Sequence, residues 1–176
     1  MAAPARLPYD EMLRDDIEQL HRCPLFREAG LGPEVLGDLA RLSTPQWAQA
    51  GEVVICEADE GDSMYVITRG RVRVDKQTPY ADTYTVTFLE AEQGGFFGEL
   101  ALLDRDLRSA SVVAETPCEF LVIRREDFLA FGDRHPAVGL MVTRRIARML
   151  AERLRRANRD LVTLFSALVH EVEERI

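Results

Sequence analysis

Glu99 and Arg108, nine residues apart, are the two residues whose types and spacing could together hold a ligand. Gly98 comes just before the glutamate, and the absence of a side chain there lets a ligand approach the backbone. A short helical turn expected over 99–103 would point its free N–H groups at an anion, and Arg108 offers phosphate oxygens a planar fork of donors. Glu99 only accepts hydrogen bonds, so its natural partner is a sugar hydroxyl. The pattern predicts a site for a phosphate that carries a sugar.

Two small residues, Ser109 and Ala110, follow the arginine and leave room for a phosphate. The Ser109 hydroxyl adds a further hydrogen-bond donor. The alternative is that Glu99 and Arg108 pair with each other and close a surface loop, which would contribute ~0–1 kcal/mol to stability. We favour a bound ligand, because the residues that flank both side chains suit one.

The order F-G-E-L-A-L-L over 97–103, followed by R-S-A-S over 108–111, resembles the phosphate-binding cassette of the cyclic nucleotide-binding domain family. This family includes catabolite activator proteins, the regulatory subunits of cAMP-dependent protein kinase and cyclic nucleotide-gated channels. The resemblance implies that Glu99 binds the ribose 2′-OH and Arg108 the cyclic phosphate, with cAMP as the expected ligand and cGMP as the alternative. The residues expected to bind the nucleotide are Phe97, Gly98, Glu99, Leu100, Ala101, Arg108, Ser109 and Ala110.

A second run, GEVVICEADEGDSMYVI over 51–67, is similar to the run GE…EGD.GD.MY.I of the same family. The sequence departs from the family in two places. Ala58 stands where relatives usually have glycine, and an alanine is costly there if the backbone needs a positive φ. The charged tip DRDL over 104–107 replaces a Gly and a Pro that many relatives carry before the arginine. These departures bear on affinity more than on the fold.

Length and composition restrict the class of protein. A chain of 176 residues with 47% hydrophobic residues fits one domain, or one domain with an appendage. No apolar run is long enough to span a bilayer, and the N-terminus lacks the apolar segment of a secretory signal. The three cysteines show no C-x-x-C spacing and the three histidines are isolated, so no metal site, catalytic site or disulfide is expected. We therefore expect a cytoplasmic protein that is not an enzyme.

Periodicity predicts an α+β fold, an antiparallel β jelly-roll barrel flanked by N-terminal helices and a long C-terminal helix. Helices are expected over 11–22, 33–42 and 127–131, and from 136 onward. Short strands are expected over 46–49, 53–57, 64–68, 71–75, 83–88, 112–114 and 120–123. The expected organisation is an arm and helix over 1–22, a nucleotide-binding barrel over 23–135 and the long helix over 136–176.

Apolar residues in the long helix recur at alternating steps of three and four, which is a heptad seam. The seam residues are Ala147, Leu150, Leu154, Ala157, Leu161, Leu164 and Leu168. Such a seam favours a parallel homodimer, and the resemblance implies the same, because catabolite activators dimerise through the equivalent helix. The alternative is a helix that folds back along its own barrel. Alanine at two seam positions predicts a weak dimer.

Residues 144–159 hold seven arginines and one glutamate, although the net charge of the whole chain is −8. The seam runs through this segment, so the arginines form the polar face of the same helix. An acidic protein is a poor non-specific binder of nucleic acid, and no helix-turn-helix follows the helix. A DNA regulator is therefore disfavoured, although a DNA-associated role for the arginines is a third hypothesis.

The expected function is that of a stand-alone cyclic-nucleotide receptor. The start of the long helix, with Leu150, Arg153 and Leu154, would cap the base and shift when the nucleotide binds. The signal would then pass to a protein partner, which the sequence does not identify. The alternative is a scaffold whose long helix binds a partner without any nucleotide.

Overall fold

The structure is a computed structural model that describes residues 9–78, 80 and 82–173 of the chain. Its helices are α1 (Tyr9–Arg22), α2 (Pro24–Arg27), α3 (Pro33–Leu42), α4 (Arg125–Arg134) and α5 (Pro136–Glu173), with short 3-10 turns η1 (Ala91–Gln93) and η2 (Glu99–Leu102). Its strands are β1 (Thr44–Ala48), β2 (Val53–Ile55), β3 (Ser63–Arg69), β4 (Arg71–Gln77), β5 (Thr83–Glu90), β6 (Phe96–Phe97), β7 (Ser111–Ala114) and β8 (Cys118–Arg124).

The strands form two antiparallel sheets, with orders β1-β8-β3-β6 and β2-β7-β4-β5. In the first sheet Tyr65 lies opposite both Val122 and Phe97, which brings the end of β6 beside β3. Aromatic and branched side chains of both sheets, among them Ile67, Val72 and Phe120, form the core between them. This arrangement confirms the predicted fold class, although within the described residues no strand pairing closes the two sheets into a barrel.

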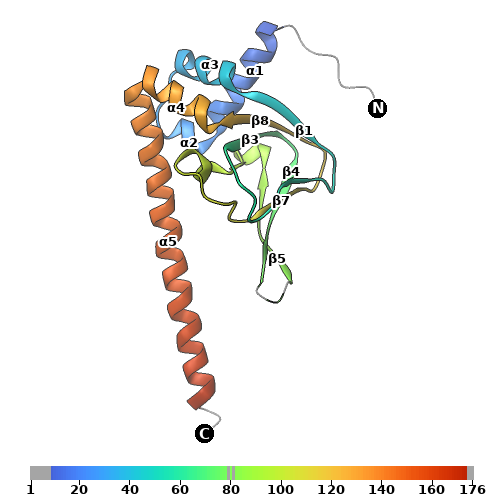
Figure 1. Ribbon diagram of the computed structural model, residues 1–176, viewed down its shortest axis with the longest axis vertical. Coiled ribbons are helices and arrows are strands. Elements are labelled where there is room, and N and C mark those ends of the chain that lie inside the picture. The colour runs from blue at the N-terminus through green and yellow to red at the C-terminus, as the bar shows by residue number, and fades with distance from the viewer. Residues whose placement is uncertain (1–8, 79, 81, 174–176) are drawn as a thin grey trace.

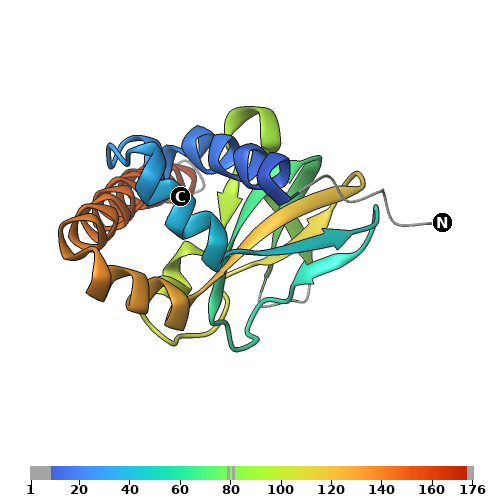
Figure 2. The same ribbon diagram turned by 90° about the horizontal axis from the view of Figure 1, so that it is seen from above.

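The helices cover one side of the strands and build a second hydrophobic core (Figures 1 and 2). Leu20, Phe26 and Leu36 from α1 to α3 meet Phe131 of α4 and Ile146 of α5 in this core. Buried residues of β3 and β8, such as Met64 and Ile123, also belong to it, so the first sheet joins the helices to the strands. The start of α5 is thereby held beside the cassette.

The turn after β2 differs from the expected strand over 53–57. The strand ends at Ile55, and the chain then turns at Ala58, which adopts a left-handed backbone with φ of 68°. In the described part of the chain, Ala58 is the only residue other than glycine with a positive φ. The Ala58 N–H donates to the Arg108 carbonyl at 2.9 Å, and the Arg108 N–H donates to the Asp59 carbonyl at 2.8 Å. Position 58 therefore requires a left-handed backbone conformation, which glycine adopts most readily. The two hydrogen bonds of the turn hold the backbone of Arg108 in place.

We expect Ala58→Gly to stabilise the fold by about 0.5–1 kcal/mol. A left-handed alanine costs roughly 1–2 kcal/mol, and the greater freedom of glycine in the unfolded chain offsets about half of that gain. Urea unfolding measures the change. The matched control is Ala130→Gly on the exposed face of α4, which should destabilise by about 1 kcal/mol, since that residue is helical. Equal losses in both variants would contradict the strain at Ala58.

Helix α5 contains 38 residues and extends well past the sheets (Figure 1). One face of its first turns is buried, with Val142 and Ile146 fully covered, whereas Leu154, Leu161 and Leu164 are 61%, 66% and 65% exposed. The alternative of a helix that folds back along its own barrel is therefore wrong for the part of α5 that carries these three leucines. The seam residue Leu168 has a side chain outside the described part of the structure. Within that part, no helix combines the length and the apolar composition that a membrane crossing requires.

Candidate functional site

Strand β6 and turn η2 position the cassette over an aromatic floor. The Phe97 ring stacks on Tyr65 with 4.9 Å between centroids, and both rings meet Phe120 edge to face. Gly98 follows with φ of +75°, and a Cβ there would lie 2.8 Å from Arg108 Nη1 and 2.9 Å from the Ser63 carbonyl oxygen. Glycine is therefore required both by the backbone angle and by the close approach of Arg108.

Glu99 is buried, with only 4% of the residue exposed. Its Oε1 accepts a hydrogen bond from Arg153 Nη1 of α5 at 2.5 Å. A buried carboxylate needs a charged or strongly donating partner, and this arginine supplies one. The side chain of Arg153 remains 59% exposed, so the pair reaches from the buried cassette to the helix surface.

The side chain of Ser63 and its carbonyl orient Arg108. Nη1 of Arg108 donates to the Ser63 carbonyl at 2.8 Å, and Nη2 donates to the Ser63 hydroxyl at 3.3 Å. The guanidinium fills the space beside Gly61, where an added Cβ would lie 2.1 Å from Arg108 Nε. Burial lowers the pKa of the Arg108 guanidinium from its ordinary value, because desolvation disfavours the charged form. No carboxylate of the described residues forms an ion pair with it, so its charge can stabilise a bound anion.

Glu99 and Arg108 do not pair with each other, so the alternative of an ion pair closing a surface loop is wrong. Both residues line one cavity of about 150 Å³, with Arg153 at its side. A second hollow of about 180 Å³, which Tyr65 helps to line, lies on another side of Arg108. The geometry thus places a carboxylate that Arg153 holds and a guanidinium without an ion-pair partner beside one cavity.

The structure brings most of the predicted ligand residues together. Gly98, Glu99, Leu100, Ala101, Arg108 and Ser109 line the cavity. Phe97 lies in the aromatic floor, and Ala110 is not among the lining residues. The Ala101 N–H, expected to face the phosphate, donates to the Gly98 carbonyl at 3.1 Å.

The three residues expected to cap the base lie in different surroundings. Arg153 lines the cavity, while Leu150 packs partly buried against the helical core and Leu154 is exposed. Helical spacing alone could not separate these environments. They depend on how Val142 and Ile146 seat the start of α5 in the helical core.

Several residues of the site escaped the sequence analysis. Asp104, Asp106 and Leu107 line the cavity, and Ser63 and Gly61 hold the arginine. The last two lie in the run over 51–67, which was a usable signal, although their contact with Arg108, 45 and 47 positions away, is set by the fold. In the part of the chain that the structure describes, no group of three or more metal-ligating side chains gathers.

Comparisons of the sequence and of the fold with known proteins point to one family of ligand-binding domains. The family model described as "Cyclic nucleotide-binding domain" matches residues 45–135. The chain is 37% identical over 143 residues to the cyclic AMP receptor protein of Thermus thermophilus, which covers 78% of this chain and 60% of that relative. It is 33% identical over 134 residues to a cyclic nucleotide-gated potassium channel of Rhizobium etli, which covers 74% of this chain and 35% of the channel.

The fold is similar to the crystal structure of the Thermus thermophilus catabolite activator protein, with a TM-score of 0.71 and 34% identity. That match covers 80% of this chain and 62% of the solved chain. The chain thus spans less than two thirds of the length of these relatives. Because the family model covers just over half of its residues, this chain belongs to the cyclic nucleotide-binding domain family.

Proposed function

We propose that this chain is a receptor for a cyclic purine nucleotide, cAMP or cGMP, bound between Glu99 and Arg108. The observation that carries the proposal is that these two side chains line one cavity without pairing, and that Arg108 has no carboxylate partner among the described residues. The cyclic phosphate binds Arg108 and the Ser109 hydroxyl, and the ribose 2′-OH donates to Glu99. Membership of the family and the receptor named among its relatives support the same ligand class.

Glu99 also gives the ligand a route to α5, because the same carboxylate that would accept the ribose hydroxyl holds Arg153. The cavity has a volume of about 150 Å³, which is smaller than the roughly 300–1,000 Å³ of most small-molecule sites. The base of the nucleotide therefore needs additional space, and Arg153 of α5 lies at the edge of the cavity where that space would open. Binding would therefore favour a different position of Arg153 and of the helix around it. This is a population shift driven by the contacts that the ligand makes in one arrangement only.

Calorimetric titration of the purified chain with cAMP and with cGMP tests the proposal. We expect saturable binding of one nucleotide per chain, with one of the two nucleotides bound more tightly. A folded chain that gives no binding heat and no thermal shift with either would overturn the proposal. It would favour instead a scaffold whose long helix binds a partner without a nucleotide.

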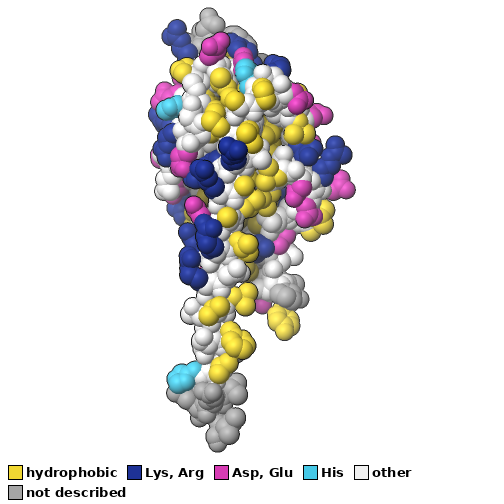
Figure 3. Space-filling view, turned by 90° about the vertical axis from the view of Figure 1, so that its left-hand side faces the viewer, with side chains coloured by type: hydrophobic (Ala, Val, Ile, Leu, Met, Phe, Trp, Pro, Cys, Tyr) yellow, Lys and Arg dark blue, Asp and Glu magenta, His cyan; other side chains and the backbone are white. Residues whose placement is uncertain are grey.

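The partner we propose for α5 is a second copy of this chain. Exposed Leu154, Leu161 and Leu164 continue the heptad spacing, and Figure 3 shows hydrophobic side chains forming a strip along the helix beside a strip of arginines. A parallel pairing of two such helices would cover the hydrophobic strip. A nucleotide-dependent shift of α5 would then change the dimer surface that a downstream protein binds.

We expect Leu161→Glu to convert the dimer to a monomer, with dimer affinity reduced at least tenfold, because a charge would be buried at the centre of the seam. Sedimentation equilibrium measures the change. The control is Thr163→Glu on the opposite face of α5, where Thr163 Oγ1 only donates to the Arg159 carbonyl. A chain that is monomeric before mutation would contradict the dimer, as would equal effects of the two variants.

A further inference from the structure

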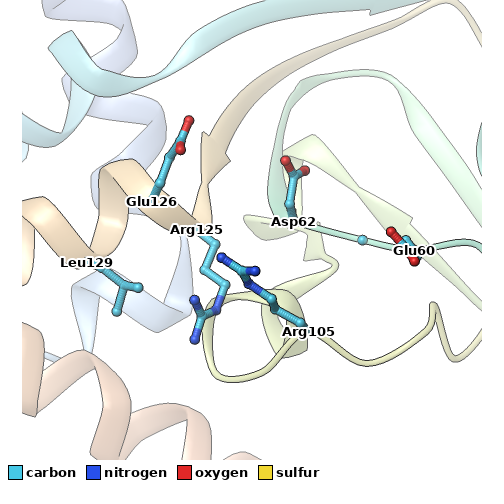
Figure 4. A pocket seen from close by; sticks show the side chains of 7 residues that line it. Glu60, Asp62, Arg105, Arg125, Glu126 and Leu129 are labelled. Carbon is cyan, nitrogen blue, oxygen red and sulfur yellow. The ribbon is translucent and has the colours of Figure 1, made fainter.

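A cavity of about 530 Å³ shares no lining residue with the cavity that Glu99 lines, and its wall includes Arg105 from the tip of the cassette. It lies between the loop over 60–62, the charged tip of the cassette and the start of α4 (Figure 4). Its volume falls within the range of small-molecule sites. Neither the cyclic nucleotide nor the heptad seam accounts for it.

Two arginines from separate segments line this cavity without an anionic partner. Arg105 makes no hydrogen bond or ion pair with the described residues. Nε of Arg125 is buried without an acceptor, and Nη2 makes only a long hydrogen bond of 3.4 Å to the Leu103 carbonyl. Figure 4 shows the Arg105 side chain coming from the cassette tip and the Arg125 side chain from the start of α4, and both line this cavity. Two like charges with unmet donors are unfavourable together unless an anion lies between them.

Three carboxylates, Glu60, Asp62 and Glu126, also line the cavity, but none of them forms an ion pair with either arginine. The carboxylates of Asp62 and Glu126 point away from the guanidinium groups (Figure 4). The cavity therefore has a cationic side and a side that only accepts hydrogen bonds.

We propose that this cavity binds a small phosphorylated molecule, with its phosphate between Arg105 and Arg125 and its hydroxyl groups directed at Glu60 and Asp62. Bidentate contact with two guanidinium groups is the geometry that phosphate oxygens favour. The charged tip over 104–107 supplies one of the two arginines, and the first residue of α4 supplies the other.

The test is a titration with inorganic phosphate at constant ionic strength, followed by melting temperature and by ³¹P line broadening. It uses the Arg108→Ala variant, so that the cassette itself offers no phosphate site. We expect a saturable rise in melting temperature. Adding Arg105→Gln should weaken phosphate binding at least tenfold, since one of the two charged forks is lost. Arg105 is exposed at the tip of the cassette, so this change is compatible with folding.

The matched control is Arg124→Gln, an exposed arginine next to Arg125 that does not line the cavity, and it should leave phosphate binding unchanged. Absence of a saturable response, or equal losses in the Arg105 and Arg124 variants, would overturn the proposal. A chain that binds phosphate through Arg105 but ignores cAMP and cGMP would retain this inference and lose the proposed function.

Discussion

Arg108→Ala is expected to abolish measurable binding of cyclic nucleotides and to leave the fold intact. The guanidinium offers two donors and a full charge to the cyclic phosphate, and charged hydrogen bonds contribute ~1.5–3 kcal/mol each. Their combined loss predicts a fall in affinity of roughly 10²–10⁴-fold. The fold should tolerate the change, because the backbone bonds of residue 108 to Ala58 and Asp59 do not involve the side chain.

Calorimetry measures the loss of nucleotide binding, and circular dichroism with urea unfolding checks the fold. The control is Arg69→Ala, which removes an arginine whose side chain is 76% exposed and pairs with Glu119 at the surface. That variant should bind the nucleotide as the unmodified chain does. Unchanged affinity in the Arg108 variant would remove Arg108 from the site, whatever the fold of the domain.

The local chemistry of the cassette could be predicted from its own residues. Gly98, Glu99 and Arg108 are close in sequence, and the properties used, namely a missing side chain, an acceptor-only carboxylate and a fork of donors, belong to the residues themselves. The two-residue period and short apolar runs also predicted most strands, although burial alternates in β7 and not in β3 or β5. The bounds differ by one or two residues at several strands, and the strand expected over 53–57 ends early, before the left-handed turn at Ala58.

The rest of the site depends on contacts that the sequence does not reveal. Ser63 holds Arg108 across 45 residues, and Arg153 reaches Glu99 across 54 residues. The seam also reads as continuous in the sequence, yet its early member Leu150 packs on the helical core, whereas Leu161 is exposed. Periodicity gives the apolar face of a helix, and tertiary packing decides which part of that face a partner can reach.

Glu99→Gln is expected to weaken nucleotide binding by roughly 10–100-fold and to loosen the start of α5 at the same time. An amide keeps the size of the side chain but loses the charge that strengthens the bonds to the ribose hydroxyl and to Arg153. The lost pairing with Arg153 should cost about 1–2 kcal/mol, less than for a fully buried pair because Arg153 is 59% exposed. The control is Glu92→Gln, an exposed glutamate of η1, which should affect neither property.

Hydrogen exchange in the segment 149–157 separates the two roles of Glu99. In the unmodified chain, nucleotide binding should change exchange in this segment, whereas in the Glu99 variant exchange should be faster and insensitive to nucleotide. Arg153→Gln should reproduce the faster exchange, and the double variant should add little, because both changes break the same ion pair. If the Arg153 variant keeps the full response of α5 to nucleotide, the pair does not transmit the signal. The helix would then respond through the packing of Met149 and Leu150 on the helical core instead.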